Sequence, residues 1–121
     1  MRNIILIIVL FLATLPLNAQ IKIDGFWITI DENKTVIEVI KQNGQHIGIR
    51  RSSNNKDYKI GELVLKDISP KGDIWEGKIY APTRKTWYNV EITPHNDILK
   101  LKISVSFFSK TIEWKRHNLQ E

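Results

Sequence analysis

Apolar and polar residues alternate along most of this chain, in short runs separated by turn signals. The clearest run places Leu99, Leu101, Ile103, Val105 and Phe107 at every second position, with lysine or serine at the positions between them. Because successive side chains of a β-strand point to opposite faces, this period predicts a strand with one buried face and one solvated face. Phe107 is therefore expected on the buried face.

Eight such runs are predicted as strands. Asn43-Gly44 lies between the second and the third, and this dipeptide favours a tight hairpin because both residues tolerate positive φ. Pro and Gly clusters at residues 69–72 and 94–97 are expected to end strands, and residues 52–59 form the longest loop. No window has helical spacing over three turns. The predicted strands are residues 25–30, 35–42, 45–51, 62–68, 74–80, 86–93, 98–108 and 110–116.

This order of elements predicts an all-β fold, an eight-stranded antiparallel up-and-down barrel. Sequential strands with short connections form a meander, and closing the meander removes two exposed edges that otherwise invite aggregation. An eight-stranded barrel is either filled by its own side chains or just wide enough for one small ligand. The sequence leaves both alternatives open.

The amino-terminal segment has the pattern of a secretory signal. Arg2 precedes an apolar run from Ile4 to Leu17, and Ala19 offers a small residue for cleavage. The run of about 14 residues is short for a membrane-spanning helix, which needs about 20. We therefore expect residues 1–19 to be a signal peptide, residues 20–121 to form one domain that does not span a membrane, and the mature protein to be periplasmic or secreted.

Composition adds two constraints. The chain has no cysteine, which excludes disulfides and a thiol-linked lipid anchor. Its net charge is +5, with 18 lysines and arginines against 13 aspartates and glutamates. This excess indicates attraction to anionic envelope surfaces and, equally, a solvated lysine-rich surface.

The two ends of the predicted barrel suggest how it closes. Gly25 and Trp27 open the first strand, while Trp114 and Arg116 end the last, and these strands are neighbours in a closed barrel. An early tryptophan under a late arginine resembles the lipocalin-type arrangement. A guanidinium over an indole face contributes about 0.5–2 kcal/mol. These four residues are expected to be structural.

Three further motifs extend this resemblance to nearly the whole predicted domain. They are Gly61-Glu62-Leu63-Val64-Leu65-Lys66, then Trp75-x-Gly77-x-Ile79-Tyr80-x-Pro82, then Lys110-Thr111-Ile112-Glu113-Trp114-Lys115-Arg116. In this order and behind a signal segment, they resemble the DUF2147 family of small exported bacterial proteins. That resemblance implies a lipocalin-like barrel and an exported location but no reaction, because the family is functionally uncharacterised.

The chain departs from this family pattern at several positions. Gln42 and Ile47 stand where many members carry cysteine, Ala81 replaces an aspartate, and Lys85 stands where a turn glycine is expected. The loop at residues 52–59 is also shorter than is common. These departures weaken any shared polar site more than they affect the fold.

No residue pattern points to an enzyme, a metal site or a cofactor. His46, His95 and His117 lack the short pairwise spacing of a zinc signature. His95 near Asp97 resembles a general base with an orienting partner, but the required nucleophile and oxyanion donors are not recognisable. An envelope hydrolase is the least favoured alternative.

The aromatic residues fall into two groups. Trp27, Trp75 and Trp114 share strand faces with aliphatic or small residues and are expected in the core. Tyr80 and Trp87 instead fall on polar faces, which favours an external patch or a contact at the barrel mouth. The residues predicted to contact a ligand or partner are Tyr80, Trp87, Tyr88 and Arg51.

These observations favour a non-enzymatic binding protein without a cofactor. Its ligand is expected to be a small apolar or amphipathic molecule of the cell envelope. The alternative is a protein–protein interaction module with a filled barrel, in which an envelope protein is the partner. Nucleic-acid binding is not expected, because of the signal segment and because Lys100 and Lys102 are not interleaved with stacking aromatic residues.

Overall fold

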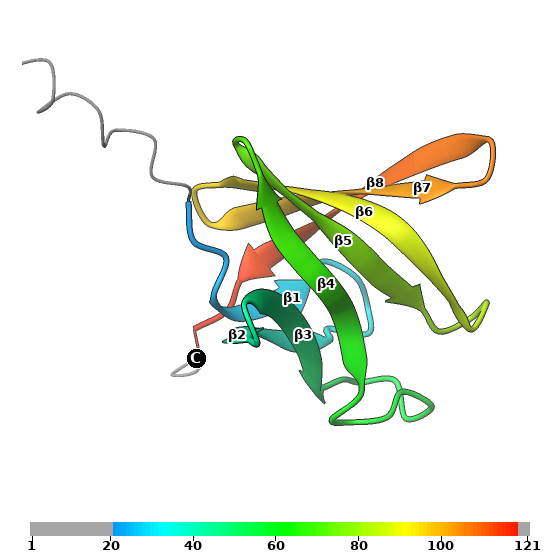
Figure 1. Ribbon diagram of the computed structural model, residues 1–121. Helices are drawn as coiled ribbons and strands as arrows, with labels where there is room; N and C mark the ends of the chain where they lie inside the picture. The colour runs from blue at the N-terminus through cyan, green and yellow to red at the C-terminus, as the bar shows by residue number, and fades with distance from the viewer. Residues whose placement is uncertain (1–20, 119–121) are drawn as a thin grey trace, which may run out of the picture.

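The computed structural model describes residues 21–118 as eight antiparallel strands that close into a barrel. Each strand pairs with the next in sequence, and β1 pairs with β8, as Figure 1 shows. The predicted fold class is confirmed. The strands are β1 (Gly25–Thr29), β2 (Val36–Gln42), β3 (Gln45–Ser52), β4 (Leu63–Lys71), β5 (Ile74–Ala81), β6 (Thr86–His95), β7 (Ile98–Val105) and β8 (Phe108–Arg116).

The predicted signal peptide, residues 1–19, lies outside the described residues. Between residues 21 and 118, the structure has no helix long and apolar enough to cross a membrane.

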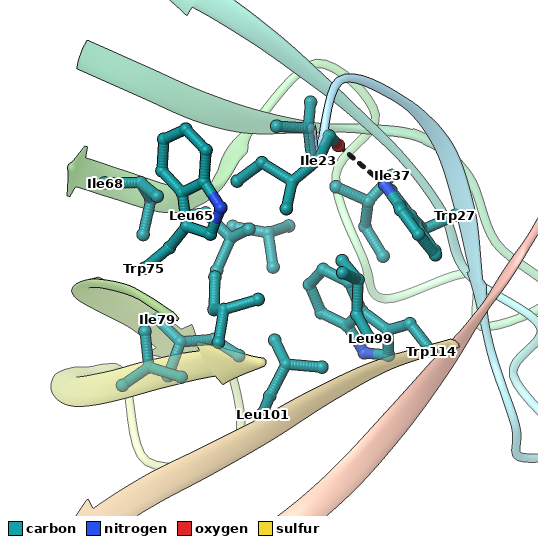
Figure 2. Close-up of a cluster of buried hydrophobic side chains, with 14 residues drawn as sticks. Ile23, Trp27, Ile37, Leu65, Ile68, Trp75, Ile79, Leu99, Leu101 and Trp114 are labelled. Carbon is teal, nitrogen blue, oxygen red and sulfur yellow. Dashed lines mark hydrogen bonds between the residues drawn. The ribbon is translucent and has the colours of Figure 1, made fainter. Parts of the chain in front are cut away.

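The barrel interior is filled by its own side chains. Three indole rings and eleven aliphatic side chains form one buried cluster, drawn in Figure 2. Full burial of each such side chain contributes about 1.5–3 kcal/mol, so this cluster is the main source of stability. Its members are Ile23, Trp27, Ile37, Val39, Val64, Leu65, Ile68, Trp75, Ile79, Val90, Ile92, Leu99, Leu101 and Trp114.

The segment that precedes β1 covers one end of the barrel. Ile23 is fully buried, and its carbonyl oxygen accepts a hydrogen bond of 2.9 Å from the Trp27 indole nitrogen, the dashed line in Figure 2. The Trp75 indole nitrogen donates to the carbonyl oxygen of Ile21 at 3.2 Å. Two core tryptophans therefore hold this segment against the cluster. We call this end of the barrel the closed end.

The Asn43-Gly44 hairpin forms as predicted and fixes the faces of β2 and β3. Asn43 and Gly44 have φ of 54° and 81°, and Gln42 pairs with Gln45. A tight turn of this kind sets the pairing register of both strands.

One expectation about a strand end was wrong. Phe107 was expected on the buried face, but Val105 pairs with Phe108, so Ser106 and Phe107 form a two-residue turn and Phe107 is fully exposed. The alternating period could not continue through that turn. The clusters at residues 69–72 and 94–97 end β4 and β6 as predicted, but each strand runs past its predicted last residue and includes its proline, at a position near the strand end where a missing N–H is tolerated.

Candidate functional site

The closed end is held by a stack of Arg116 on Trp27. The guanidinium carbon of Arg116 lies 3.9 Å from the centre of the indole ring, and the two residues are paired across β1 and β8. Arg116 Nη1 also donates a hydrogen bond of 2.8 Å to the carbonyl oxygen of Asp24. Gly25 has φ of 119°, and a Cβ at this position would lie 2.7 Å from that nitrogen. The expected contact between the early tryptophan and the late arginine is therefore present.

Trp114 also lies where β8 pairs with β1, but its side chain is in the core. It is 2 % exposed and pairs with Thr29 on one side and Leu99 on the other. Its indole nitrogen is buried without a hydrogen-bond partner in the described structure. Its ring fills the interior beside the seam between β1 and β8.

Tyr80 and Trp87 form a half-buried aromatic pair on the outside of the barrel. They are cross-strand partners on β5 and β6, with ring centres 5.2 Å apart. Lys66 of β4 places its ammonium nitrogen 4.3 Å from the centre of the Trp87 ring. We call these three residues the outer aromatic surface.

The other two predicted contact residues do not join this surface. Tyr88 is paired with Ile79 and packs against the core cluster, so it faces the interior. Arg51 lies on the outside of β3, where Nε and Nη2 each lie 2.9 Å from Glu38 Oε1. The structure thus brings Tyr80 and Trp87 together and separates Tyr88 and Arg51 from them.

Arg50, which was not among the residues predicted to contact a ligand or partner, lies at a second site. Its side chain is almost completely buried, with 3 % exposed. Nη1 donates to the carbonyl oxygen of Lys59 at 3.0 Å and lies 3.7 Å from Glu62 Oε1, and the guanidinium carbon lies 4.8 Å from the centre of the Tyr58 ring. Arg50 Nε is buried without a partner among the described residues. Buried guanidinium groups normally have their N–H groups paired, so this atom is an exception among the described polar groups.

Arg50 lies at a half-open cavity of about 230 Å³. The cavity carries three basic and two acidic side chains together with two tyrosines. The residues that line it are Arg50, Asp57, Tyr58, Lys59, Glu62, Tyr80, Pro82 and Lys85. We call it the Arg50 cavity.

The position of Arg50 follows from the hairpin register. Val39 pairs with Gly48 and Ile37 with Arg50, and directly paired residues point to the same face of a sheet. Because Ile37 and Val39 are buried in the core, Arg50 must also point inward. The register set by the Asn43-Gly44 turn was enough to predict that Arg50 points inward. The prediction was hidden because the aliphatic residues Ile47 and Ile49, which look like core residues, lie on the outer face of β3.

The three histidines differ in their surroundings: His46 is buried, His117 is half-buried and His95 is exposed. His46 lies 3.1 Å from Asp24 Oδ1 and makes an edge contact with the Trp75 ring at 4.8 Å. His95 pairs with Ile98 across the turn between β6 and β7. No group of three or more potential metal-binding side chains is present within residues 21–118.

The geometry defines a class of protein, an up-and-down antiparallel β-barrel of eight strands with a filled interior. A family model described as "Uncharacterized protein conserved in bacteria (DUF2147)" matches residues 25–116, so the chain belongs to this family. The match begins at Gly25, the first residue of β1, and ends at Arg116, the last residue of β8. Comparisons with curated proteins and with solved structures give no significant match.

Proposed function

We propose that this protein is a non-enzymatic binding protein of the cell envelope and that it binds a partner protein through the outside of the barrel. The observation that carries the proposal is the filled interior. Three tryptophans and eleven aliphatic side chains occupy the volume in which a barrel of this size would otherwise hold a ligand. A binding function is therefore assigned to the outer surface.

The outer aromatic surface is the best candidate for that contact. Aromatic side chains contribute strongly to protein interfaces because they bury a large area with few rotatable bonds. The rings of Trp87 and Tyr80 already contact each other, with centres 5.2 Å apart, and the ammonium nitrogen of Lys66 lies 4.3 Å from the centre of the Trp87 ring. Preorganisation of this kind lowers the entropy lost on binding.

A photo-activated cross-linking residue in place of Asn89 tests this proposal. Asn89 is exposed, lies two positions beyond Trp87 on the same face of β6, and accepts a hydrogen bond of 2.6 Å from Lys78. We expect one discrete cross-linked protein in cells, and we expect its loss in a variant that combines Trp87→Ala with Tyr80→Ala. Arg51→Ala is the matched control, because Arg51 is an exposed residue on another strand. A product that survives the double change would reject this surface.

A second candidate function is binding of a small anionic or amphipathic molecule at the Arg50 cavity. The observation that favours it is the buried Arg50 Nε without a partner, at a cavity that Lys59 and Lys85 also line. A carboxylate or phosphate group pairs well with a guanidinium because their geometries match. The volume of about 230 Å³ suits a head group rather than a whole lipid.

The neighbouring arginines provide a matched pair for testing this second function. Arg50→Met removes the buried guanidinium and keeps an apolar side chain that reaches the position of Nε, whereas Arg51→Met makes the same change at an exposed charge one residue away. Medium-chain carboxylates and alkyl phosphates are expected to raise the melting temperature of the unchanged protein and of the Arg51 variant. No gain is expected for the Arg50 variant. Equal gains in all three proteins would exclude the cavity as the binding site.

A further inference from the structure

The hairpin between β7 and β8 ends in two exposed phenylalanines. Phe107 is completely exposed, with a relative exposure of 103 %, and Phe108 is 60 % exposed. In Figure 1 this hairpin (orange) projects from one side of the barrel, as the β5–β6 hairpin also does. Adjacent large apolar side chains at a projecting tip are unusual for a protein that contacts only water.

The requirements of the fold do not account for these residues. The turn consists of Ser106 and Phe107, and Ser106 adopts φ of 52°, a conformation that asparagine or glycine adopts more readily. A polar residue at position 107 would serve the turn equally well. The apolar tip therefore requires an explanation in terms of binding.

The charge of the hairpin indicates the binding partner. Between Ile98 and Ile112 it carries Lys100, Lys102 and Lys110 and no acidic residue. All three lysines are exposed. The whole chain has a net charge of +5. The electric field of the whole protein therefore attracts anionic surfaces, as the hairpin lysines do. Aromatic residues at a tip with basic residues behind them complement a bilayer whose surface contains anionic lipids.

The spacing of these groups fits the layers of a bilayer. Lys110 lies two residues from Phe108 along β8, a distance of about 7 Å. The polar head-group layer is about 5–8 Å thick on each side of the hydrocarbon core. When the phenylalanine rings lie at the boundary with the hydrocarbon, Lys110 therefore reaches the level of the phosphates.

We infer that this protein docks on anionic lipid bilayers by inserting Phe107 and Phe108, while Lys102 and Lys110 bind the head groups. A bilayer is favoured over a protein partner because the tip exposes two apolar rings and because no acidic residue lies between Ile98 and Ile112, although Lys100 and Lys102 pair across the strands with Glu113 and Glu91. The contact is peripheral and reversible, since only two side chains insert. It uses a different part of the barrel from the outer aromatic surface, so it stands independently of the proposed function.

The absence of cysteine makes a direct test straightforward. A single Phe107→Cys change allows an environment-sensitive fluorophore to be attached at the tip, and Ile60→Cys provides the control. Ile60 is an exposed apolar residue of the β3–β4 loop, 59 % exposed. For the vesicle experiments, each variant is purified in the form that accumulates in the cells that produce it. Vesicles contain either phosphatidylcholine alone or phosphatidylcholine with 30 % phosphatidylglycerol.

We expect the fluorophore at position 107 to shift to shorter wavelength with the anionic vesicles only, and the fluorophore at position 60 not to shift. In sedimentation, Phe107→Ser combined with Phe108→Ser is expected to reduce binding at least tenfold, while Ile60→Ser leaves it unchanged. Binding is also expected to weaken in 0.5 M salt, which screens the lysines. An unshifted probe at position 107, or equal binding by the double variant, would overturn the inference. So would a tip that inserts equally into neutral vesicles.

Discussion

Replacing Arg116 with alanine is expected to lower the free energy of unfolding by about 2 kcal/mol. The guanidinium carbon lies 3.9 Å from the centre of the Trp27 ring, and such a contact contributes about 0.5–1 kcal/mol at a partly exposed site. The hydrogen bond of 2.8 Å from Nη1 to the Asp24 carbonyl oxygen contributes about 1.5 kcal/mol, the lower limit for a charged donor. For a domain of about 100 residues, the loss corresponds to a fall in melting temperature of about 10 °C.

Urea unfolding followed by tryptophan fluorescence measures this loss. Lys115→Ala is the matched control, because Lys115 is the exposed neighbour of Arg116 on β8, and it is expected to change stability by less than about 0.5 kcal/mol. Arg116→Lys keeps the charge but lacks the planar group that covers the ring, so an intermediate loss is expected. A double-mutant cycle with Trp27→Phe isolates the energy of the stack itself.

Two results would refute this account of the closed end. If Arg116→Ala unfolds at the same urea concentration as the Lys115 control, the stack does not hold β1 against β8. If Arg116→Lys is as stable as the unchanged protein, a point charge is sufficient, and the planar contact with Trp27 is not the cause.

Three other changes test the filled interior and the turns. Leu101→Ala is expected to cost about 2–5 kcal/mol and to leave an apolar cavity that binds xenon or benzene; a loss below about 1 kcal/mol would show that the interior is not closely packed. Gly77→Ala is expected to cost about 1–3 kcal/mol, because the new Cβ would lie 2.5 Å from Ile68 Cδ1 and 2.8 Å from backbone carbonyl oxygens of β4. Calorimetry measures this loss, and an unchanged melting temperature would show that the neighbouring atoms of β4 can move to make room for the Cβ. Lys85→Gly is expected to stabilise by about 0.5–1 kcal/mol, because Lys85 has φ of 52°, whereas Arg84→Gly in the same turn should not stabilise.

The sequence was sufficient to predict the architecture because two local signals agree. The alternation of apolar and polar residues predicted the strands, and the Asn43-Gly44 turn predicted the register of β2 with β3. The seam was predictable because its residues, Trp27 and Arg116, are chemically distinctive and stand at the ends of the series. The prediction failed where the alternating pattern of β7 was extended across a turn without asparagine or glycine. The Ser106-Phe107 turn lacks asparagine and glycine, so the period appeared to continue through it.

The candidate sites were less predictable because they depend on contacts between distant strands. Arg50 and Arg51 are adjacent basic residues in the sequence, and only the register of Arg50 with Ile37 shows that Arg50 alone points inward. The Arg50 cavity also needs Tyr58 and Lys85 from two separate loops, whose positions no local pattern specifies. Tyr80 and Trp87 were found because an aromatic residue on a polar face is visible in the sequence itself.

The barrel can close only when β8, the last strand, pairs with β1, the first. Three residue pairs join the two strands, from Trp27–Arg116 to Thr29–Trp114, and they unite the first strand with the last. While the chain folds, β2 to β7 can each pair on both sides with strands adjacent in the sequence, but β1 has a partner on one side only until β8 reaches it. The folding chain therefore has an open strand edge until Arg116 lies beside Trp27, and it can pair wrongly with other chains during that interval.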